Sequence, residues 1–144
     1  MKYRIYLDNC CFNRPYDDQA QLLVQLETEA KLFVQQSVLQ DTFELVWSYI
    51  LDYENSLNPY NVRKRSIAKW RNIAMLRVNS SESIIRCTKE IMLKGIKTKD
   101  AMHIACALDA KCHYFLTTDK KLLRTSIDKI NIVSPIDFIK ILNA

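Results

Sequence analysis

Short apolar runs bounded by polar residues alternate along the chain with longer segments in which apolar residues recur every three or four positions. Short runs of this kind are typical of buried parallel strands, and the longer segments are typical of amphipathic helices. The predicted strands are residues 3–8, 43–47, 76–78, 114–117 and 130–133. Because strands and helices alternate, we predict an α/β fold, a three-layer α/β/α sandwich with a mostly parallel central sheet.

The longest predicted helix follows a polar turn at residues 13–18. Its apolar residues are spaced by four and three positions and form a stripe that we expect to face the core, made of Leu22, Leu26, Ala30, Phe33 and Val34. The charged residues Glu27, Glu29 and Lys31 lie off this stripe. The pattern therefore predicts that they face away from the core.

Five other helices are predicted. Two cover residues 49–57 and 62–74, a third includes Ile84 to Met92, a fourth begins at Thr98, and the last follows Ser134. Capping residues mark the ends of several of them. Short hydroxyl side chains accept hydrogen bonds from the free amides of a first helical turn, so the predicted N-caps are Ser48, Ser80, Thr98 and Ser134. The terminal helix has further start signals in Pro135 and Asp137. Gly95 is expected to end the helix that includes Ile84 to Met92.

The composition indicates one domain over residues 1–144. The chain is 49% apolar, which suffices for a core, and one glycine and three prolines leave little room for linkers. A net charge of +5 favours an anionic partner. Five cysteines form no paired framework, and the chain opens directly into a strand, so we expect a reducing, cytoplasmic location. No apolar run approaches the length of a membrane span.

Acidic residues stand at the ends of predicted elements. Asp8 follows the first strand, Asp119 follows the fourth, and Asp100 lies in the first turn of the helix that begins at Thr98. Ligands of open α/β sheets bind at the carboxyl ends of the strands, so these three carboxylates are expected to converge on one edge. Glu54 shares the inward face of its helix with apolar residues, whereas Asp52 points elsewhere.

Each acid alone has an ordinary interpretation as a capping or turn residue. Together they predict more, because carboxylates brought close repel one another and need either raised pKa values or a cation. Carboxylate and water oxygens are the preferred ligands of Mg²⁺ and Mn²⁺. Such a site can activate water and neutralise a phosphodiester. The acids therefore predict a divalent-metal centre.

Other candidate sites are weaker. His103, Cys106, Cys112 and His113 lack the paired spacing of a zinc site, and ordinary core and surface roles are favoured for them. The basic helix over residues 62–74 is more typical of a solvated face than of an RNA patch, and its Trp70 is expected in the core. With a single glycine, a glycine-rich phosphate loop is excluded.

Four stretches resemble the motifs of the PIN domain family, in the family's order and over nearly the whole chain. They are Tyr6-Leu7-Asp8, Ser48-Tyr49-Ile50-Leu51-Asp52-Tyr53-Glu54, Lys99-Asp100-Ala101-Met102-His103-Ile104-Ala105 and Leu116-Thr117-Thr118-Asp119. The third and fourth are the more specific. The resemblance implies a parallel sheet flanked by helices and metal-dependent cleavage of RNA. Many small members are VapC-like toxins of toxin–antitoxin pairs.

Carried over by position, the resemblance implies that Asp8, Glu54, Asp100 and Asp119 are the catalytic, metal-holding acids and that Thr117 and Asn9 support them. The chain departs from many members after its first acid, where it has Asn9-Cys10-Cys11-Phe12, and after its fourth, where lysines 120 and 121 replace a further acid.

The expected function is therefore that of a ribonuclease using Mg²⁺ or Mn²⁺, with RNA as substrate. An antitoxin and a second copy of the chain are the candidate protein partners, and no membrane association is expected. The alternative is a PIN-like RNA-binding or assembly module without catalysis. Retention of all four acids favours the enzyme.

Overall fold

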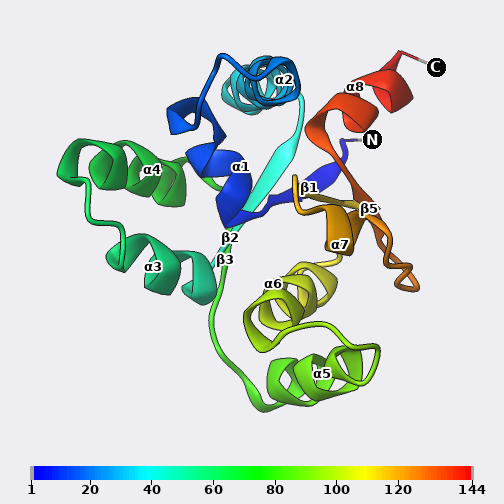
Figure 1. Ribbon diagram of the computed structural model, residues 1–144. Helices are drawn as coiled ribbons and strands as arrows, with labels where there is room; N and C mark the ends of the chain where they lie inside the picture. The colour runs from blue at the N-terminus through cyan, green and yellow to red at the C-terminus, as the bar shows by residue number, and fades with distance from the viewer. Residues whose placement is uncertain (1, 144) are drawn as a thin grey trace.

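A five-stranded sheet, parallel throughout, forms the centre of the protein in a computed structural model that describes residues 2–143 (Figure 1). The strand order is β3-β2-β1-β4-β5. In register, Ile5 lies opposite Leu45 on one side and Tyr114 on the other. The strands are β1 (Arg4–Leu7), β2 (Glu44–Ser48), β3 (Leu76–Val78), β4 (Tyr114–Leu116) and β5 (Asn131–Val133). The predicted α/β sandwich is confirmed.

Helices cover both faces of this sheet. Figure 1 shows α2 and α8 beside each other on one face, and α5 and α6 packed together on the other. The helices are α1 (Asn9–Asn13), the 3-10 turn η1 (Arg14–Tyr16), α2 (Leu22–Leu39), α3 (Tyr49–Ser56), α4 (Asn61–Ile73), α5 (Glu82–Met92), α6 (Thr98–Asp109), α7 (Lys120–Leu123) and α8 (Pro135–Leu142). Within residues 2–143, none combines the length and the hydropathy needed to cross a bilayer.

The capping predictions are correct for two helices and wrong for two. The hydroxyl of Ser48 accepts from the Leu51 amide, and that of Ser134 accepts from the Asp137 amide. At α5 the N-cap is Ser81 rather than Ser80, because the Ser81 hydroxyl is the one that reaches an amide three residues ahead, at 3.2 Å. Thr98 is already helical, and Lys97 occupies the N-cap of α6 without a side-chain bond.

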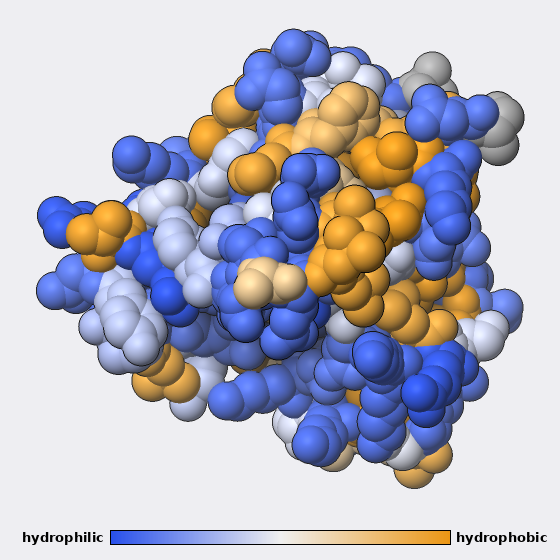
Figure 2. Space-filling view, turned by 45° about the horizontal axis from the view of Figure 1, so that its top comes forward, coloured by the Kyte–Doolittle hydropathy of each residue, from blue (hydrophilic) through white to orange (hydrophobic). Residues whose placement is uncertain are grey.

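The predicted inward stripe of α2 is correct for Val34, which is fully buried, but wrong for Leu22, Leu26 and Phe33. The helix exposes Leu22, Leu26 and Phe33 to 68%, 44% and 54%, and Figure 2, which turns this side of the molecule toward the viewer, shows hydrophobic residues gathered on the surface. Its buried face instead includes Glu27 and Lys31. Glu27, Thr28 and Lys31 contact partners that are distant in sequence.

Those partners come from the segment after β1. Glu27 forms an ion pair with Arg14 of η1 at 3.1 Å, and Thr28 donates to the Arg14 carbonyl at 3.2 Å. The ammonium of Lys31 lies 5.8 Å from the centre of the Phe12 ring, within reach of a cation–π interaction. Charged and polar groups therefore contact α1 and η1 beside the buried Val24, Val34 and Val38, while the larger apolar residues Leu22, Leu26 and Phe33 are left exposed.

The core surrounds the central strand. Ile5, Tyr6 and Leu7 of β1 have no exposed surface, and the Tyr6 ring stacks on Phe115 of β4 with 5.3 Å between ring centres. Trp70 of α4 is half-buried and packs against this core, in line with its predicted place. A rigid central strand fixes the position of whatever follows it, and the residue that follows it is Asp8.

Candidate active site

The strand order places a topological switch point between β1 and β4. From β1 the chain builds β2 and β3 toward one edge of the sheet, and then β4 and β5 toward the other. Loops leaving the carboxyl ends of such neighbouring strands diverge, which leaves a crevice for a ligand. Asp8 follows β1 directly, and Asp119 follows β4 by three residues.

Asp8 is buried, with 6% of its surface exposed, and both of its carboxylate oxygens are held. Oδ1 accepts from the Asn9 amide at 2.8 Å and so caps the short helix α1. Oδ2 accepts from the Thr117 hydroxyl at 2.8 Å. The contact of Asn9 with this acid is through its main chain, since its side-chain oxygen accepts from Asn13.

Thr117 connects two of the predicted acids. Besides donating to Asp8, its Oγ1 accepts from the Asp119 amide at 3.1 Å. Asp119 is the N-cap of α7, where its Oδ1 accepts from the amides of Lys121 and Leu122 at 2.8 and 3.2 Å. Its ordinary capping role is therefore present, with the carboxylate at the same sheet edge as Asp8.

Glu54 reaches the site from α3 and contacts a residue that the sequence analysis treated as core. Glu54 Oε1 is hydrogen-bonded to Nε2 of His103, a side chain that is 1% exposed. The same nitrogen lies 3.8 Å from Asp8 Oδ1. His103 follows Asp100 by three positions on α6, and this spacing, which places both on one helix face, was the available signal for it.

Asp100 lies in the first turn of α6, where the helix dipole favours a carboxylate. Its pKa is nevertheless raised, first by burial and then by the negative charges of Asp8 and Asp119, while His103 opposes the shift. Glu54 adds a smaller effect in the raising direction. The charges of the other three predicted acids therefore reach Asp100.

The site also has a thiol that was not predicted to belong to it. Cys10 Sγ lies 3.5 Å from Asp8 Oδ2 and 3.4 Å from Thr117 Oγ1. Its neighbour Cys11 is fully buried, as expected for a small hydrophobic residue. Asp52 faces away from the acids, as predicted, and accepts from the Trp47 indole at 2.8 Å.

The structure does not bring His103, Cys106, Cys112 and His113 together as a zinc site. His113 accepts a hydrogen bond from the Arg4 amide at 2.9 Å, apart from His103. Among residues 2–143, the group able to hold a metal consists of Asp8, Glu54 and His103, each with one ligand atom within 4.8 Å of the others. Two carboxylates and an imidazole are a chemically suitable donor set for a divalent cation. The residues present therefore fit such an ion.

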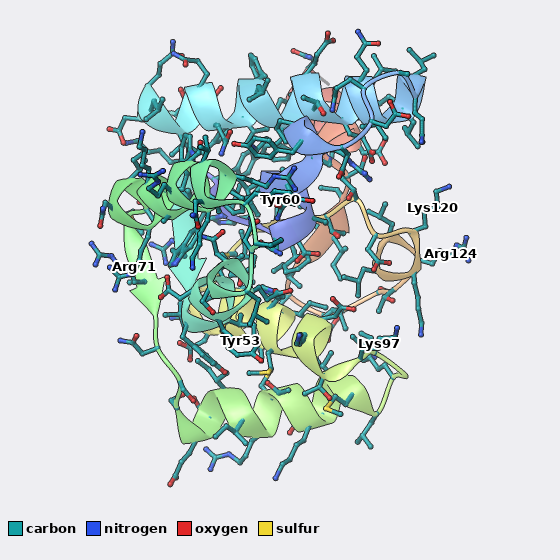
Figure 3. The ribbon with its side chains drawn as sticks, turned by 60° about the vertical axis from the view of Figure 1, so that its left-hand side comes forward. Tyr53, Tyr60, Arg71, Lys97, Lys120 and Arg124 are labelled. Atoms are coloured by element: carbon teal, nitrogen blue, oxygen red, sulfur yellow. The ribbon has the colours of Figure 1, made fainter. Side chains whose placement is uncertain are left out.

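Positive and aromatic side chains lie on or next to α3, α6 and α7, the helices that carry Glu54 and Asp100 or follow Asp119. Figure 3 shows Lys97 before α6, Lys120 and Arg124 at α7, and Tyr53 and Tyr60 at α3 and before α4. Lys99 lies next to Asp100 in sequence, and its ammonium is 5.4 Å from the centre of the Tyr53 ring. An anionic ligand that approaches the carboxylates would thus meet cations on its way.

Comparisons with known proteins agree with this architecture. A model of the PIN domain matches residues 5–128. A chain in the crystal structure of VapBC2 from Rickettsia felis bound to a DNA fragment from their promoter is similar, with a TM-score of 0.57 and 14% identity. The match covers 90% of this chain and 96% of that one. The search of curated proteins finds no match. Since the family model spans most of the sequence, including all four acids, the chain belongs to the PIN domain family.

Proposed function

We propose that this protein is a divalent-metal-dependent endoribonuclease, with Asp8, Glu54, Asp100 and Asp119 as its catalytic acids. The observation that carries the proposal is the grouping of ligand atoms of Asp8, Glu54 and His103 within 4.8 Å of one another after β1. Burial, and then the charges of Asp8 and Asp119, raise the pKa of Asp100. An unneutralised cluster of this kind disfavours its own charged state. Membership of a family whose members are generally nucleases supports the same assignment.

The metal would be Mg²⁺ or Mn²⁺, held at Asp8 and Glu54 with Asp100 and Asp119 beside them. A bound divalent cation supplies an activated water and positive charge next to a phosphodiester. The chain contributes the orientation of the ligands, because Thr117 and the Asn9 amide fix both oxygens of Asp8. Lys97, Lys120 and Arg124 would attract the polyanionic strand, so affinity would fall as salt rises.

The test compares Asp100→Asn with Asp52→Asn on one mixed-sequence RNA with Mn²⁺. The first removes a charge from the cluster while preserving shape, so cleavage is expected to fall by about 10²–10⁴-fold. The second alters an acid that faces Trp47 and Arg71, and nearly parental cleavage is expected. Retained RNA binding by both variants would locate the loss in chemistry.

Two results would contradict the assignment. If the parent binds RNA but never cuts it with either metal, the protein is the inert binding or assembly module. If Asp100→Asn cuts as well as the parent, the activity belongs to another site. Parallel assays on single-stranded DNA of the same sequence determine whether RNA is the preferred substrate.

The exposed side of α2 supports a protein partner, and we propose that this partner is an antitoxin. Leu26, Ala30 and Phe33 of α2 form a groove with Ile136 and Ile139 of α8. Contiguous apolar surface of this kind marks interaction sites. The VapBC2 complex is a toxin–antitoxin assembly with a similar fold. Co-expression with the product of an adjacent small reading frame should yield a complex that Phe33→Asp disrupts. A homodimer through the same face is the other outcome, and light scattering of the protein alone detects it.

A further inference from the structure

His103 reaches the acid site from α6, and each of its ring nitrogens contacts a different polar group. The side chain is 1% exposed and comes from the same face of α6 as Asp100, one turn further along. Its Nδ1 faces the buried interior and its Nε2 faces the carboxylates. The ring therefore joins the Tyr6 hydroxyl on one side to the Glu54 carboxylate on the other.

The interior side of the ring is held by two hydroxyls. The Tyr6 hydroxyl lies 2.6 Å from His103 Nδ1 and 2.5 Å from Ser48 Oγ. A phenol hydroxyl can accept one hydrogen bond and donate another, and both neighbours of the Tyr6 oxygen are within that reach. Tyr6 can then accept from Nδ1–H and donate to Ser48. Without a cation, the hydrogen bond to the Glu54 carboxylate needs a proton on Nε2. When a cation displaces that proton, Nδ1 becomes the donor to Tyr6 and Nε2 is free to offer its lone pair to the ion.

The site side of the ring meets oxygen atoms from two different elements. Nε2 contacts Glu54 Oε1 from α3 and lies 3.8 Å from Asp8 Oδ1 at the end of β1. The three atoms are within 4.8 Å of one another. A partner that orients the distal nitrogen of a histidine is the usual companion of a metal-binding imidazole, and Tyr6 occupies that position.

We propose that His103 Nε2 is a metal ligand alongside Asp8 and Glu54, which makes the centre a mixed nitrogen–oxygen site with Tyr6 as the residue that orients the imidazole. This inference rests on the proposed metal-dependent function and specifies its metal site. Because Mg²⁺ prefers oxygen ligands, whereas transition ions accept imidazole, the site should bind Mn²⁺ more tightly than Mg²⁺.

The chain offers a clean spectroscopic test, because it has two histidines and the second, His113, bonds to the Arg4 amide elsewhere. Pulsed electron paramagnetic resonance of bound Mn²⁺ detects a directly coordinated ¹⁴N nucleus. The expected modulation is present in the parent and in His113→Gln, and absent in His103→Gln. Calorimetry should show that Tyr6→Phe weakens Mn²⁺ binding by about 10–100-fold, as loss of an orienting partner does.

A labelling experiment protects the test if His103→Gln fails to fold. In His113→Gln grown with ¹⁵N-histidine, His103 is the sole imidazole, and the modulation should change from the ¹⁴N to the ¹⁵N pattern. If Mn²⁺ binds and RNA is cut but no nitrogen modulation occurs, the centre is oxygen-only and the histidine proposal fails alone. If the parent binds no Mn²⁺ at millimolar concentration, the metal-dependent function fails with it.

Discussion

The hydroxyl of Thr117 donates a 2.8 Å hydrogen bond to Oδ2 of Asp8, which joins the residue after β4 to the residue after β1. Thr117 Oγ1 also accepts from the Asp119 amide, so the Thr117 side chain contacts both Asp8 after β1 and Asp119 after β4. An oriented ligand needs such support, since residues that hold a ligand in place typically affect metal affinity or activity by about 10–100-fold.

Thr117→Val should therefore lower RNA cleavage by about 10–100-fold, because it keeps the shape of the side chain and removes the donor to Asp8. Thr117→Ser retains the hydroxyl and serves as the matched control, with activity close to that of the parent. Initial rates at saturating Mn²⁺ provide the measurement. Equal activity in Val and Ser variants would show that the hydrogen bond does not matter for the chemistry.

Asp100→Asn should stabilise the metal-free protein at neutral pH. The pKa of Asp100 is raised in the folded state, so above its usual value of 3.8 the folded protein binds more protons than the unfolded one, and stability falls as pH rises. Replacing the acid removes this cost, and the melting temperature at pH 7 should increase by a few degrees.

The same comparison has two internal checks. The gain of Asp100→Asn should shrink as pH falls toward 3.8 and vanish below it, where the carboxyl is protonated in both the folded and the unfolded state. Added Mn²⁺ should raise the melting temperature of the parent with the logarithm of its free concentration, and should raise that of the variant less. A variant less stable than the metal-free parent at pH 7 would mean that Asp100 is chiefly a helix-start residue.

Lys31→Met should increase the free energy of unfolding at pH 7 by about 1–3 kcal/mol, since burial lowers the pKa of Lys31 from 10.5 to about 8. Below pH 8 the amine is charged in both states and its burial cost is fully present. Between pH 8 and 10.5 the folded protein loses the proton first, so parental stability rises with pH relative to the variant. Urea unfolding at pH 7 and pH 10 should show the gap narrowing, and a constant gap would point to packing.

The orientation of α2 predicts different effects on stability for substitutions at the adjacent residues Phe33 and Val34. Phe33 is 54% exposed and Val34 is fully buried. Phe33→Ala should change stability by no more than about 0.5 kcal/mol, as exposed substitutions usually do. Val34→Ala should cost about 2 kcal/mol through lost burial and a cavity. If urea unfolding shows the larger loss for Phe33→Ala, Phe33 rather than Val34 lies on the buried face of the helix.

The strands, and the positions of Asp8, Asp100 and Asp119 at the ends of elements, could be predicted from sequence because each depends on neighbouring residues. Buried parallel strands are short apolar runs, and Asp8 or Asp119 is read directly from its place after such a run. The short helices α1 and α7 escaped prediction because five and four residues carry too little periodicity. Their N-caps, Asp8 and Asp119, were singled out because each follows a predicted strand.

What failed depends on contacts between distant segments. The burial of Glu27 is possible because Arg14 supplies the opposite charge, and no periodicity within α2 contains that information. His103 was overlooked because an imidazole among alanines and isoleucine on a helix suggests core packing. Its partners Tyr6 and Glu54 come from β1 and α3, so its role depends on the assembled fold.

The pairing of Thr117 with Asp8 spans 109 positions of sequence, which has a consequence for synthesis. A nascent chain that has emerged only through α6 carries Asp8, Glu54 and Asp100, yet β4 has not arrived to flank β1 and supply the hydroxyl. Domains fold largely as units during translation. The Thr117–Asp8 contact can therefore form only when most of the protein has left the ribosome, so most of the mRNA is translated before the acid site is complete.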